Sequence, residues 1–261
     1  MRVINLASGS KGNCTLVEGK NIAFLIDCGI ELKSAEELLE KVGCAPRKIK
    51  AIIVSHTHSD HIKSVARFSS KYDAVVYATD KNWIEGKLQK VPLERRKFIA
   101  TEDFFLDEFT ISPFEVSHDA ISTIGVSVLS NGRKFSIATD LGVVTNEIFE
   151  RMTGSDLIFI ESNYDDYMLK NGSYPPQIKR RIASKCGHLS NIECADAITR
   201  LAGFGTKHFL LMHISENNNT KELAYGTTIN VLKNKNLDKN IVVGVAFQDK
   251  VSSNFVLKDN I

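Results

Sequence analysis

The chain has 261 residues, of which 43% are hydrophobic and 25% charged, a composition that is ordinary for a globular protein and excludes a disordered chain. Because the net charge is only +2, any attraction for phosphate must come from local clusters of charge or from bound metal. No apolar run approaches the roughly 18 residues of a membrane span, so we expect neither export nor membrane insertion. The five cysteines are widely spaced, as is typical of reduced thiols in a cytoplasmic protein.

Three short strands are predicted at the start of the chain, over 2–7, 14–17 and 21–26. The loop Ser8-Gly9-Ser10-Lys11-Gly12-Asn13 separates the first two, and Ser10 and Asn13 in it are candidates for contact with substrate. Asp27 ends the third strand, where an Asp before Gly usually forms a turn. A helix over 32–42 then leads to a buried strand over 51–54.

The segment His56-Thr57-His58-Ser59-Asp60-His61 directly follows this buried strand. Folds of the α/β type place their chemistry at the carboxyl ends of strands, so these side chains are presented together. An H-x-H-x-D-H match arises from composition alone with a probability on the order of 10⁻⁴ to 10⁻³ per chain. Three imidazoles and a carboxylate in one loop therefore indicate a metal site.

The remaining elements follow from apolar periodicity and turn residues. Further strands are predicted over 75–78, 97–100, 104–106, 109–116, 122–129, 133–139, 157–160, 208–212, 241–246 and 253–257. Helices are predicted over 62–70, 81–90, 145–152, 192–202 and 219–234. Ser190 and Glu193 form a capping box for the fourth of these helices. Because no linker or low-complexity segment interrupts this series, we expect one domain over 1–261.

Chemistry-bearing residues recur at the ends of apolar runs: His118 after 109–116, Asp140 after 133–139 and His213 after 208–212. With the metal loop, the candidate ligands are His56, His58, Asp60, His61, His118, Asp140 and His213. Imidazole and carboxylate without thiolate suit Zn²⁺ or Mn²⁺, with Fe²⁺ as a further option. The donors exceed what one tetrahedral ion needs, so we expect two divalent metal ions that share one carboxylate and generate hydroxide near neutral pH.

This pattern resembles the metallo-β-lactamase superfamily. The resemblance implies an α/β (α+β) fold, a four-layer αβ/βα sandwich of two packed sheets flanked by helices. It further implies that His56, His58 and His118 bind one metal, that Asp60, His61 and His213 bind the other, and that Asp140 bridges them. Only 72 residues separate Asp140 from His213, too few for the inserted cap domain of some relatives.

Further segments resemble a particular branch. Ile160-Glu161-Ser162-Asn163 and Gly187-His188-Leu189-Ser190 look like segments of tRNase Z-like phosphodiesterases, in which a Glu-oriented His protonates the leaving oxygen. Together with Ser8–Asn13, Asp27-Cys28-Gly29 and His213-Ile214-Ser215, they resemble the bacterial YycJ (WalJ) subgroup, which is associated with 5′-to-3′ exonuclease activity on DNA. The resemblance implies attack by a metal-bridging hydroxide that Asp60 orients, with His188, held by Glu161, as the acid.

Alternatives remain open. The basic triplet Lys179, Arg180 and Arg181 could bind a DNA backbone, although a basic helix face is usually only solvated. A cyclic phosphodiesterase, thioesterase or lactonase would use the same metal centre on a small molecule. Diiron oxygen reductases share the fold but carry Glu where this chain has His58.

His208 lies in no motif and is interpreted as structural. The protein is expected to be a monomer or a homodimer.

Overall fold

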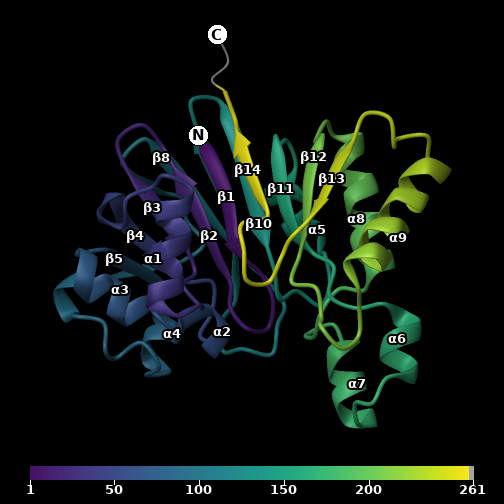
Figure 1. Cartoon of the computed structure of the whole chain (residues 1–261), viewed down its shortest axis with the longest axis horizontal. Coiled ribbons are helices and arrows are strands. Elements are labelled where there is room, and N and C mark those ends of the chain that lie inside the picture. Colours follow the sequence, from purple (N-terminus) through teal and green to yellow (C-terminus); the bar gives the residue numbers. More distant parts are fainter. Residues whose placement is uncertain (259–261) are drawn as a thin grey trace.

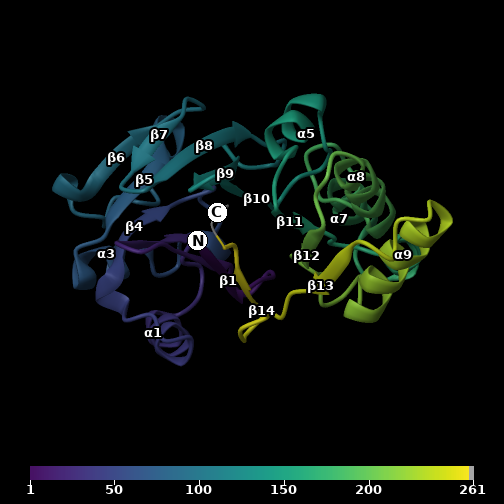
Figure 2. The ribbon, with the colours of Figure 1, turned by 90° about the horizontal axis from the view of Figure 1, so that it is seen from above.

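The computed structural model describes residues 1–258. Its strands form two seven-stranded sheets that lie face to face, in the orders β14-β1-β2-β3-β4-β5-β6 and β13-β12-β11-β10-β9-β8-β7 (Figures 1 and 2). The strands of the first sheet are β1 (Arg2–Ala7), β2 (Cys14–Glu18), β3 (Ala23–Ile26), β4 (Ile49–Ile53), β5 (Val75–Thr79), β6 (Arg96–Ile99) and β14 (Ser253–Val256). Those of the second are β7 (Phe104–Leu106), β8 (Phe109–Glu115), β9 (Ile124–Ser130), β10 (Arg133–Ala138), β11 (Leu157–Glu161), β12 (His208–Met212) and β13 (Val242–Val245).

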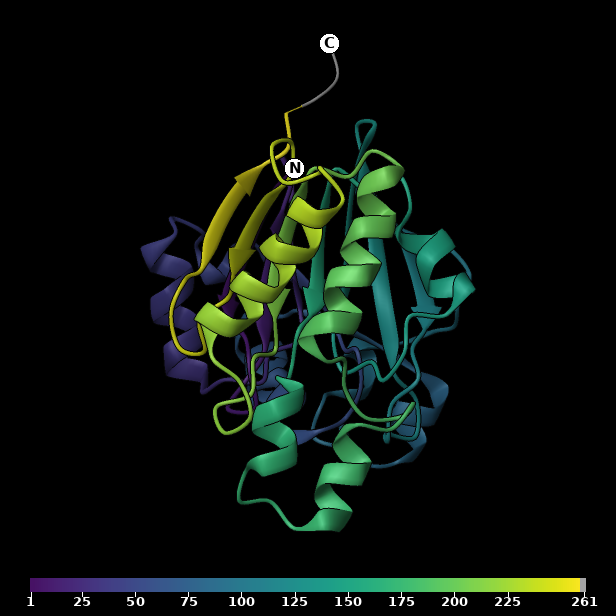
Figure 3. The same cartoon turned by 90° about the vertical axis from the view of Figure 1, so that its right-hand side faces the viewer.

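Apolar residues alternate between two cores along the strands. In β11, Leu157 and Phe159 pack between the two sheets, whereas Ile158 and Ile160 pack against helices on the outer face. The helices are α1 (Leu32–Lys41), α2 (Ser59–Ile62), α3 (Val65–Tyr72), α4 (Asp80–Ile84), α5 (Asn146–Met152), α6 (Asp166–Asn171), α7 (Pro176–Ile182), α8 (Asn191–Gly203) and α9 (Lys221–Asn234). Helices α1 and α3 cover the first sheet, and α5, α8 and α9 cover the second (Figures 2 and 3). The predicted four-layer αβ/βα sandwich is confirmed.

The strand directions bring the candidate residues to one edge of the molecule. Strands β3 to β6 run parallel to one another, and so do β10 to β13. Their carboxyl ends therefore gather at the edge where α2, α6 and α7 lie, at the bottom of Figure 1. Each half of the chain thus delivers its strand ends to the same rim.

All fourteen predicted strands occur, each displaced by at most two residues at either end. The predicted helix over 81–90 is wrong beyond Ile84, because Gly86 adopts the left-handed conformation at φ +86° and ends it. Helix α6 was not predicted; Asp165 caps it by accepting a hydrogen bond from the backbone N–H of Met168. Within residues 1–258, no helix has the length and apolar character needed to cross a bilayer.

Candidate metal centre

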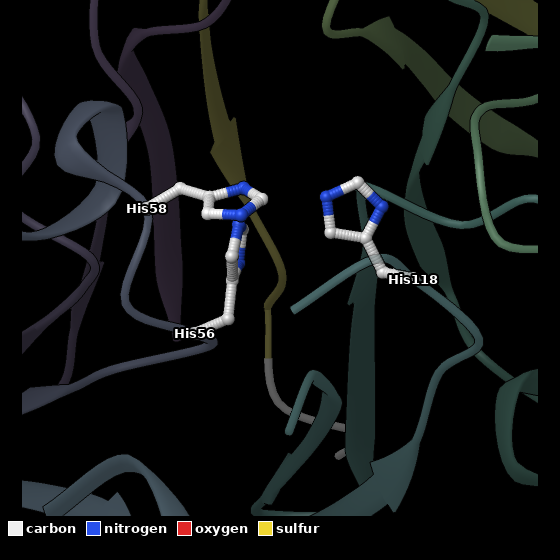
Figure 4. Close-up of side chains that lie close together, drawn as sticks. All are labelled: His56, His58 and His118. Atoms are coloured by element: carbon white, nitrogen blue, oxygen red, sulfur yellow. The ribbon is translucent and has the colours of Figure 1, made fainter. Parts of the chain in front are cut away.

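Three histidines from the two sheets converge at the rim. His56 and His58 lie in the loop after β4, and His118 lies in the loop after β8. Each points into the space between them (Figure 4), with ring centroids 4.6 Å apart for His56 and His58 and 5.1 Å apart for His58 and His118. One ligand nitrogen from each lies within 4.8 Å of the others, as binding of one ion requires.

A second group lies next to the first. Ligand atoms of Asp60, His61 and His213 also fall within 4.8 Å of one another. Asp140 lies between the groups: its Oδ2 is 3.1 Å from Nε2 of His61, and its Oδ1 is 3.6 Å from Nε2 of His118. This position is the one that a carboxylate shared by two ions must occupy.

The outer nitrogens of these histidines are held by the protein. Nδ1 of His61 lies 2.7 Å from the carboxylate of Asp27, and Nδ1 of His213 lies 2.6 Å from that of Glu161. Nδ1 of His118 donates to the carbonyl oxygen of Gly187 at 3.2 Å. Such partners fix the ring and its tautomer, so each histidine presents Nε2 to the centre.

Several inward atoms make no hydrogen bond within the protein, although oppositely charged groups lie near two of them: Asp119 near Nε2 of His118, and His61 near Oδ2 of Asp140. Among the described residues, the buried atoms without a hydrogen bond include Nε2 of His56, His118 and His213 and Oδ2 of Asp140. Leaving one such atom unpaired costs about 1–3 kcal/mol, so native proteins rarely do so. Four such atoms around one small space are what a site for divalent metal would contain. Their nitrogen and oxygen donors suit Zn²⁺, Mn²⁺ or Fe²⁺.

The two carboxylates at the centre are ionised. Burial alone would raise the pKa of Asp140, but the adjacent His213 and His61 hold that pKa well below its usual range. The pKa of Asp60 is also lowered, because the nearby His213 and His61 together outweigh the effect of burial. Both side chains are therefore ready to bind a cation near neutral pH.

The histidines divide by environment. Burial, together with His61 nearby, lowers the pKa of His56 well below its ordinary value, and burial with His118 lowers that of His58. For His61, burial is outweighed by Asp27 and Asp140, which raise its pKa to about 10. His213 has a raised pKa as well, because Asp140 outweighs its burial. Without metal, His56 and His58 are thus neutral, whereas His61 and His213 carry protons that an ion must displace.

Glu161 lies between His213, a candidate ligand, and His188, the predicted acid. It is fully buried at the end of β11, and its Oε1 lies 2.9 Å from Nδ1 of His188 and 2.6 Å from Nδ1 of His213. Its Oε2 accepts the backbone N–H groups of Leu141 and Leu189. Burial raises the pKa of Glu161, but His188 and His213 lower it to about 2 overall, so the side chain is a carboxylate.

The backbone is strained at three of these positions. The backbone φ angles of Asp27, Asp140 and His213 are +60°, +55° and +55°. They lie in the left-handed region, which residues other than glycine rarely adopt. Each follows the end of a strand, so the chain turns sharply and aims the side chain at the rim. Strain of this kind costs on the order of 1–3 kcal/mol per residue and is concentrated at functional sites.

Two early motifs brace the metal loop. The backbone N–H of Asn13 donates to the carbonyl of Asp60, and its side-chain Nδ2 lies 3.3 Å from Asp60 Oδ2 and 3.0 Å from His61 Nε2. Gly29 approaches the same loop so closely that a Cβ there would lie 1.6 Å from the carbonyl oxygen of Asp60. Asn13 is buried against two candidate ligands, and its predicted contact with substrate stays a prediction.

Ser10 and the basic triplet, the other residues predicted to contact substrate, lie in different places relative to the candidate ligands. Ser10 is exposed and lines a pocket that also contains His188 and His213. Of the basic triplet, Arg181 lies at the mouth of the metal centre, whereas Lys179 bonds to the carbonyl of Lys170 and Arg180 is exposed on α7.

Two residues near the metal loop were missed or only partly understood from the sequence. Asp27 forms the expected turn, but it also accepts hydrogen bonds from the backbone and hydroxyl of Ser55 besides its contact with His61. The sequence does not predict a role for Asp119, but its Oδ1 lies 3.1 Å from Nε2 of His118, and its Oδ2 pairs with Arg181 at 2.7 Å. Its position directly after His118 was the one available signal.

Comparison with known proteins shows which family the chain belongs to. The family described as the beta-lactamase superfamily domain matches residues 23–214. The chain is 35% identical over 246 residues to exodeoxyribonuclease YycJ of Bacillus anthracis, covering 93% of this chain and 92% of that protein. It is 36% identical over 250 residues to exodeoxyribonuclease WalJ of Streptococcus pneumoniae, covering 93% and 91%.

Solved structures show the same fold at lower sequence identity. The metallo-beta-lactamase fold protein YhfI of Bacillus subtilis is 16% identical with a TM-score of 0.73, covering 97% of this chain and 98% of that one. The short form of human tRNase Z is 18% identical with a TM-score of 0.65, covering 97% and 99%. The chain therefore belongs to the metallo-β-lactamase superfamily of metal-dependent hydrolases and, within it, to the group of the YycJ and WalJ proteins.

Proposed function

We propose that this chain is a metal-dependent phosphodiesterase that degrades DNA as a 5′-to-3′ exonuclease. The relatives with 35% and 36% identity over most of their length are named exodeoxyribonucleases, which supports DNA as the substrate. The observation that carries the proposal is the contact between Glu161 and His188 beside the candidate ligands, at 2.9 Å. Phosphodiester cleavage expels a poor alkoxide leaving group, which needs a proton donor at this place.

We propose that His56, His58 and His118 hold one ion, that Asp60, His61 and His213 hold the other, and that Asp140 is shared; Zn²⁺ and Mn²⁺ are our first candidates. Divalent ions bound there activate water as a nucleophile near neutral pH and offset negative charge on the phosphodiester. Asp60 accepts a hydrogen bond from the attacking water and orients it.

His188 acts on the leaving side. Burial would lower its pKa, but the carboxylate of Glu161 raises it overall, which favours the protonated imidazole. Because Nδ1 faces Glu161, the proton to be transferred is on Nε2. That proton passes to the departing oxygen, and Glu161 stabilises the cationic form before the transfer.

A small-molecule hydrolase is the alternative. The cleft beside the centre has a volume of about 930 Å³, and Lys63, Arg67, Lys87, Lys90 and Arg181 line it. This charge favours a polyanion over a neutral ester. We also propose a cytoplasmic location, where the five free thiols stay reduced.

The deciding experiment measures metal content together with hydrolysis of 5′-labelled single- and double-stranded DNA, RNA and bis-p-nitrophenyl phosphate. We expect metal-dependent cleavage of DNA with a steep loss of affinity as salt rises. Preference for a small ester, with no salt dependence, would overturn the assignment of substrate while leaving the metal centre intact.

A further inference from the structure

Two hollows of different character meet at the metal centre. The first, which we call the basic cleft, has a volume of about 930 Å³ and opens beside α2 and α3; Lys63, Arg67, Lys87, Lys90 and Arg181 line it. The second, which we call the terminal pocket, has a volume of about 270 Å³ and lies beside α7; its lining includes Tyr174, Ile178, Asn217 and His188. Arg181 lines both and so marks their junction.

The basic cleft is suited to a chain of phosphates. Asp60, a candidate metal ligand, is the one carboxylate among its lining residues within the described chain. Lys63 and Arg67 pair with Glu31 at 3.0 Å and 2.9 Å, and Lys87 pairs with Glu85 at 2.6 Å. Exposed pairs of this kind are weak, so phosphates can replace the carboxylates. Several cations along one open cleft can contact several successive phosphates.

The terminal pocket is suited to a single nucleotide. Its volume lies just below the ~300 Å³ at which pockets for small ligands begin, so it has no room for a second nucleotide. Tyr174 offers an aromatic ring, and its hydroxyl accepts a hydrogen bond from Asn217 at 2.7 Å. Apolar Ile178 and Ile182 complete this wall, and besides the histidines Arg181 is the one cation among the residues of 1–258 that line the pocket.

The proton donor belongs to the terminal pocket. His188 is among the residues that line the pocket and is not among those that line the basic cleft. A donor must lie within hydrogen-bond reach of the oxygen that it protonates. The leaving oxygen is therefore on the nucleotide in the terminal pocket, while the phosphorus stays attached to the strand in the basic cleft.

We propose that the strand lies in the basic cleft and that the terminal pocket accepts only its 5′-terminal nucleotide, so that one nucleotide is released per cut. This inference rests on the proposed nuclease function and adds where each part of the substrate binds. In the cut, the water oxygen bonds to phosphorus and one water proton passes to solvent. The P–O3′ bond breaks with its electron pair on O3′, which takes the proton from Nε2 of His188. The shortened strand keeps a 5′-phosphate.

The basic cleft is tested by binding. Lys87→Gln/Lys90→Gln is compared with Lys235→Gln/Lys239→Gln, a pair of exposed lysines outside both hollows. The probe is a phosphorothioate single strand about 20 nucleotides long, which resists cleavage by the metal-loaded protein. We expect the slope of log affinity against log salt to fall by about 1.4 for the first pair, about 0.7 per lost phosphate contact, and to stay unchanged for the second. Equal slopes for both pairs would overturn the placement of the strand.

The terminal pocket is tested by filling it. Ile178→Trp places a large side chain in the pocket, and Ile192→Trp makes the same change at an exposed position on α8. We expect Ile178→Trp to slow release of the first nucleotide by about 100-fold, the scale of loss from misplacing a substrate, without weakening binding of the long strand. Wild-type release of oligonucleotides as first products, or an unaffected Ile178→Trp, would refute the pocket assignment. Absence of any DNA cleavage by the wild type would instead refute the proposed function.

Discussion

Replacement of Glu161 by Gln keeps the shape of the side chain and removes its charge. In the wild-type chain, Oε2 of Glu161 accepts hydrogen bonds from two backbone N–H groups, and Oε1 faces the Nδ1 atoms of two histidines. If the amide oxygen of Gln stays with the backbone donors, its NH₂ group faces Nδ1 of His188 and His213. Both rings must then accept at Nδ1 and carry their proton on Nε2. Nε2 of His213 thereby loses the lone pair that a metal needs.

The size of the effect follows from these contacts. Loss of the outer partner of a metal-bound histidine costs 10- to 100-fold in metal affinity, or about 1.4–2.7 kcal/mol. The proposed assignment gives His213 to one ion only, so the ion held by His56, His58 and His118 should bind as before. DNA turnover should fall further, because the cationic form of His188 is no longer stabilised and general-acid catalysis contributes about 10²–10⁴-fold.

The assay is a competition titration with a metal-binding dye on chelator-stripped protein, followed by kinetics on labelled DNA. Glu150→Gln on α5 is the matched control, because Glu150 is exposed and lines neither the basic cleft nor the terminal pocket. Wild-type affinity for both ions in the Glu161 variant would refute the tautomer argument. Equal weakening of both ions would show that Glu161 stabilises the whole rim rather than His213.

Three further predictions concern the same site. His188→Gln should slow DNA cleavage by about 10²–10⁴-fold with both ions retained, but should barely slow bis-p-nitrophenyl phosphate, whose leaving group needs no proton; equal losses would contradict its role as acid. The raised pKa of His61, about 10 against an ordinary 6.5, stabilises the metal-free fold below pH 6.5, and this contribution is lost as pH rises through 10. The melting temperature of metal-free protein should therefore fall over this range, with proton release on metal binding in calorimetry, and a flat profile would contradict this. Arg181→Gln removes the pair with Asp119 and should change stability by less than about 1 kcal/mol in denaturant melts while weakening DNA binding at low salt.

Most of the architecture was predictable because its signals are local. Strand β11 alternates between two apolar cores, and its sequence Leu157-Ile158-Phe159-Ile160 indicated a buried strand. The capping box of Ser190 and Glu193 forms at the start of α8 as predicted. The metal loop was predictable because its donors are adjacent in the chain, and the more distant ones because they follow apolar runs.

What could not be predicted depends on contacts between distant segments. Asp27 holds His61, 34 residues away, and the sequence around Asp27 indicates only a turn. The second partner of Glu161, His213, lies 52 residues further along the chain. Asp119 forms an ion pair with Arg181 at 2.7 Å, and only tertiary packing brings these two residues together. Single-residue patterns carry no information on such pairs, so only the folded arrangement reveals them.

The central claim is that one carboxylate, that of Asp140, joins two metal ions into a single reactive centre. Mass spectrometric metal counting on wild type and on Asp140→Asn, after identical loading, tests it most directly. We predict two divalent ions per wild-type chain and, in the variant, loss of tight loading at both positions together with loss of turnover. A wild-type chain that holds a single ion, or a variant that still holds two, would contradict the claim.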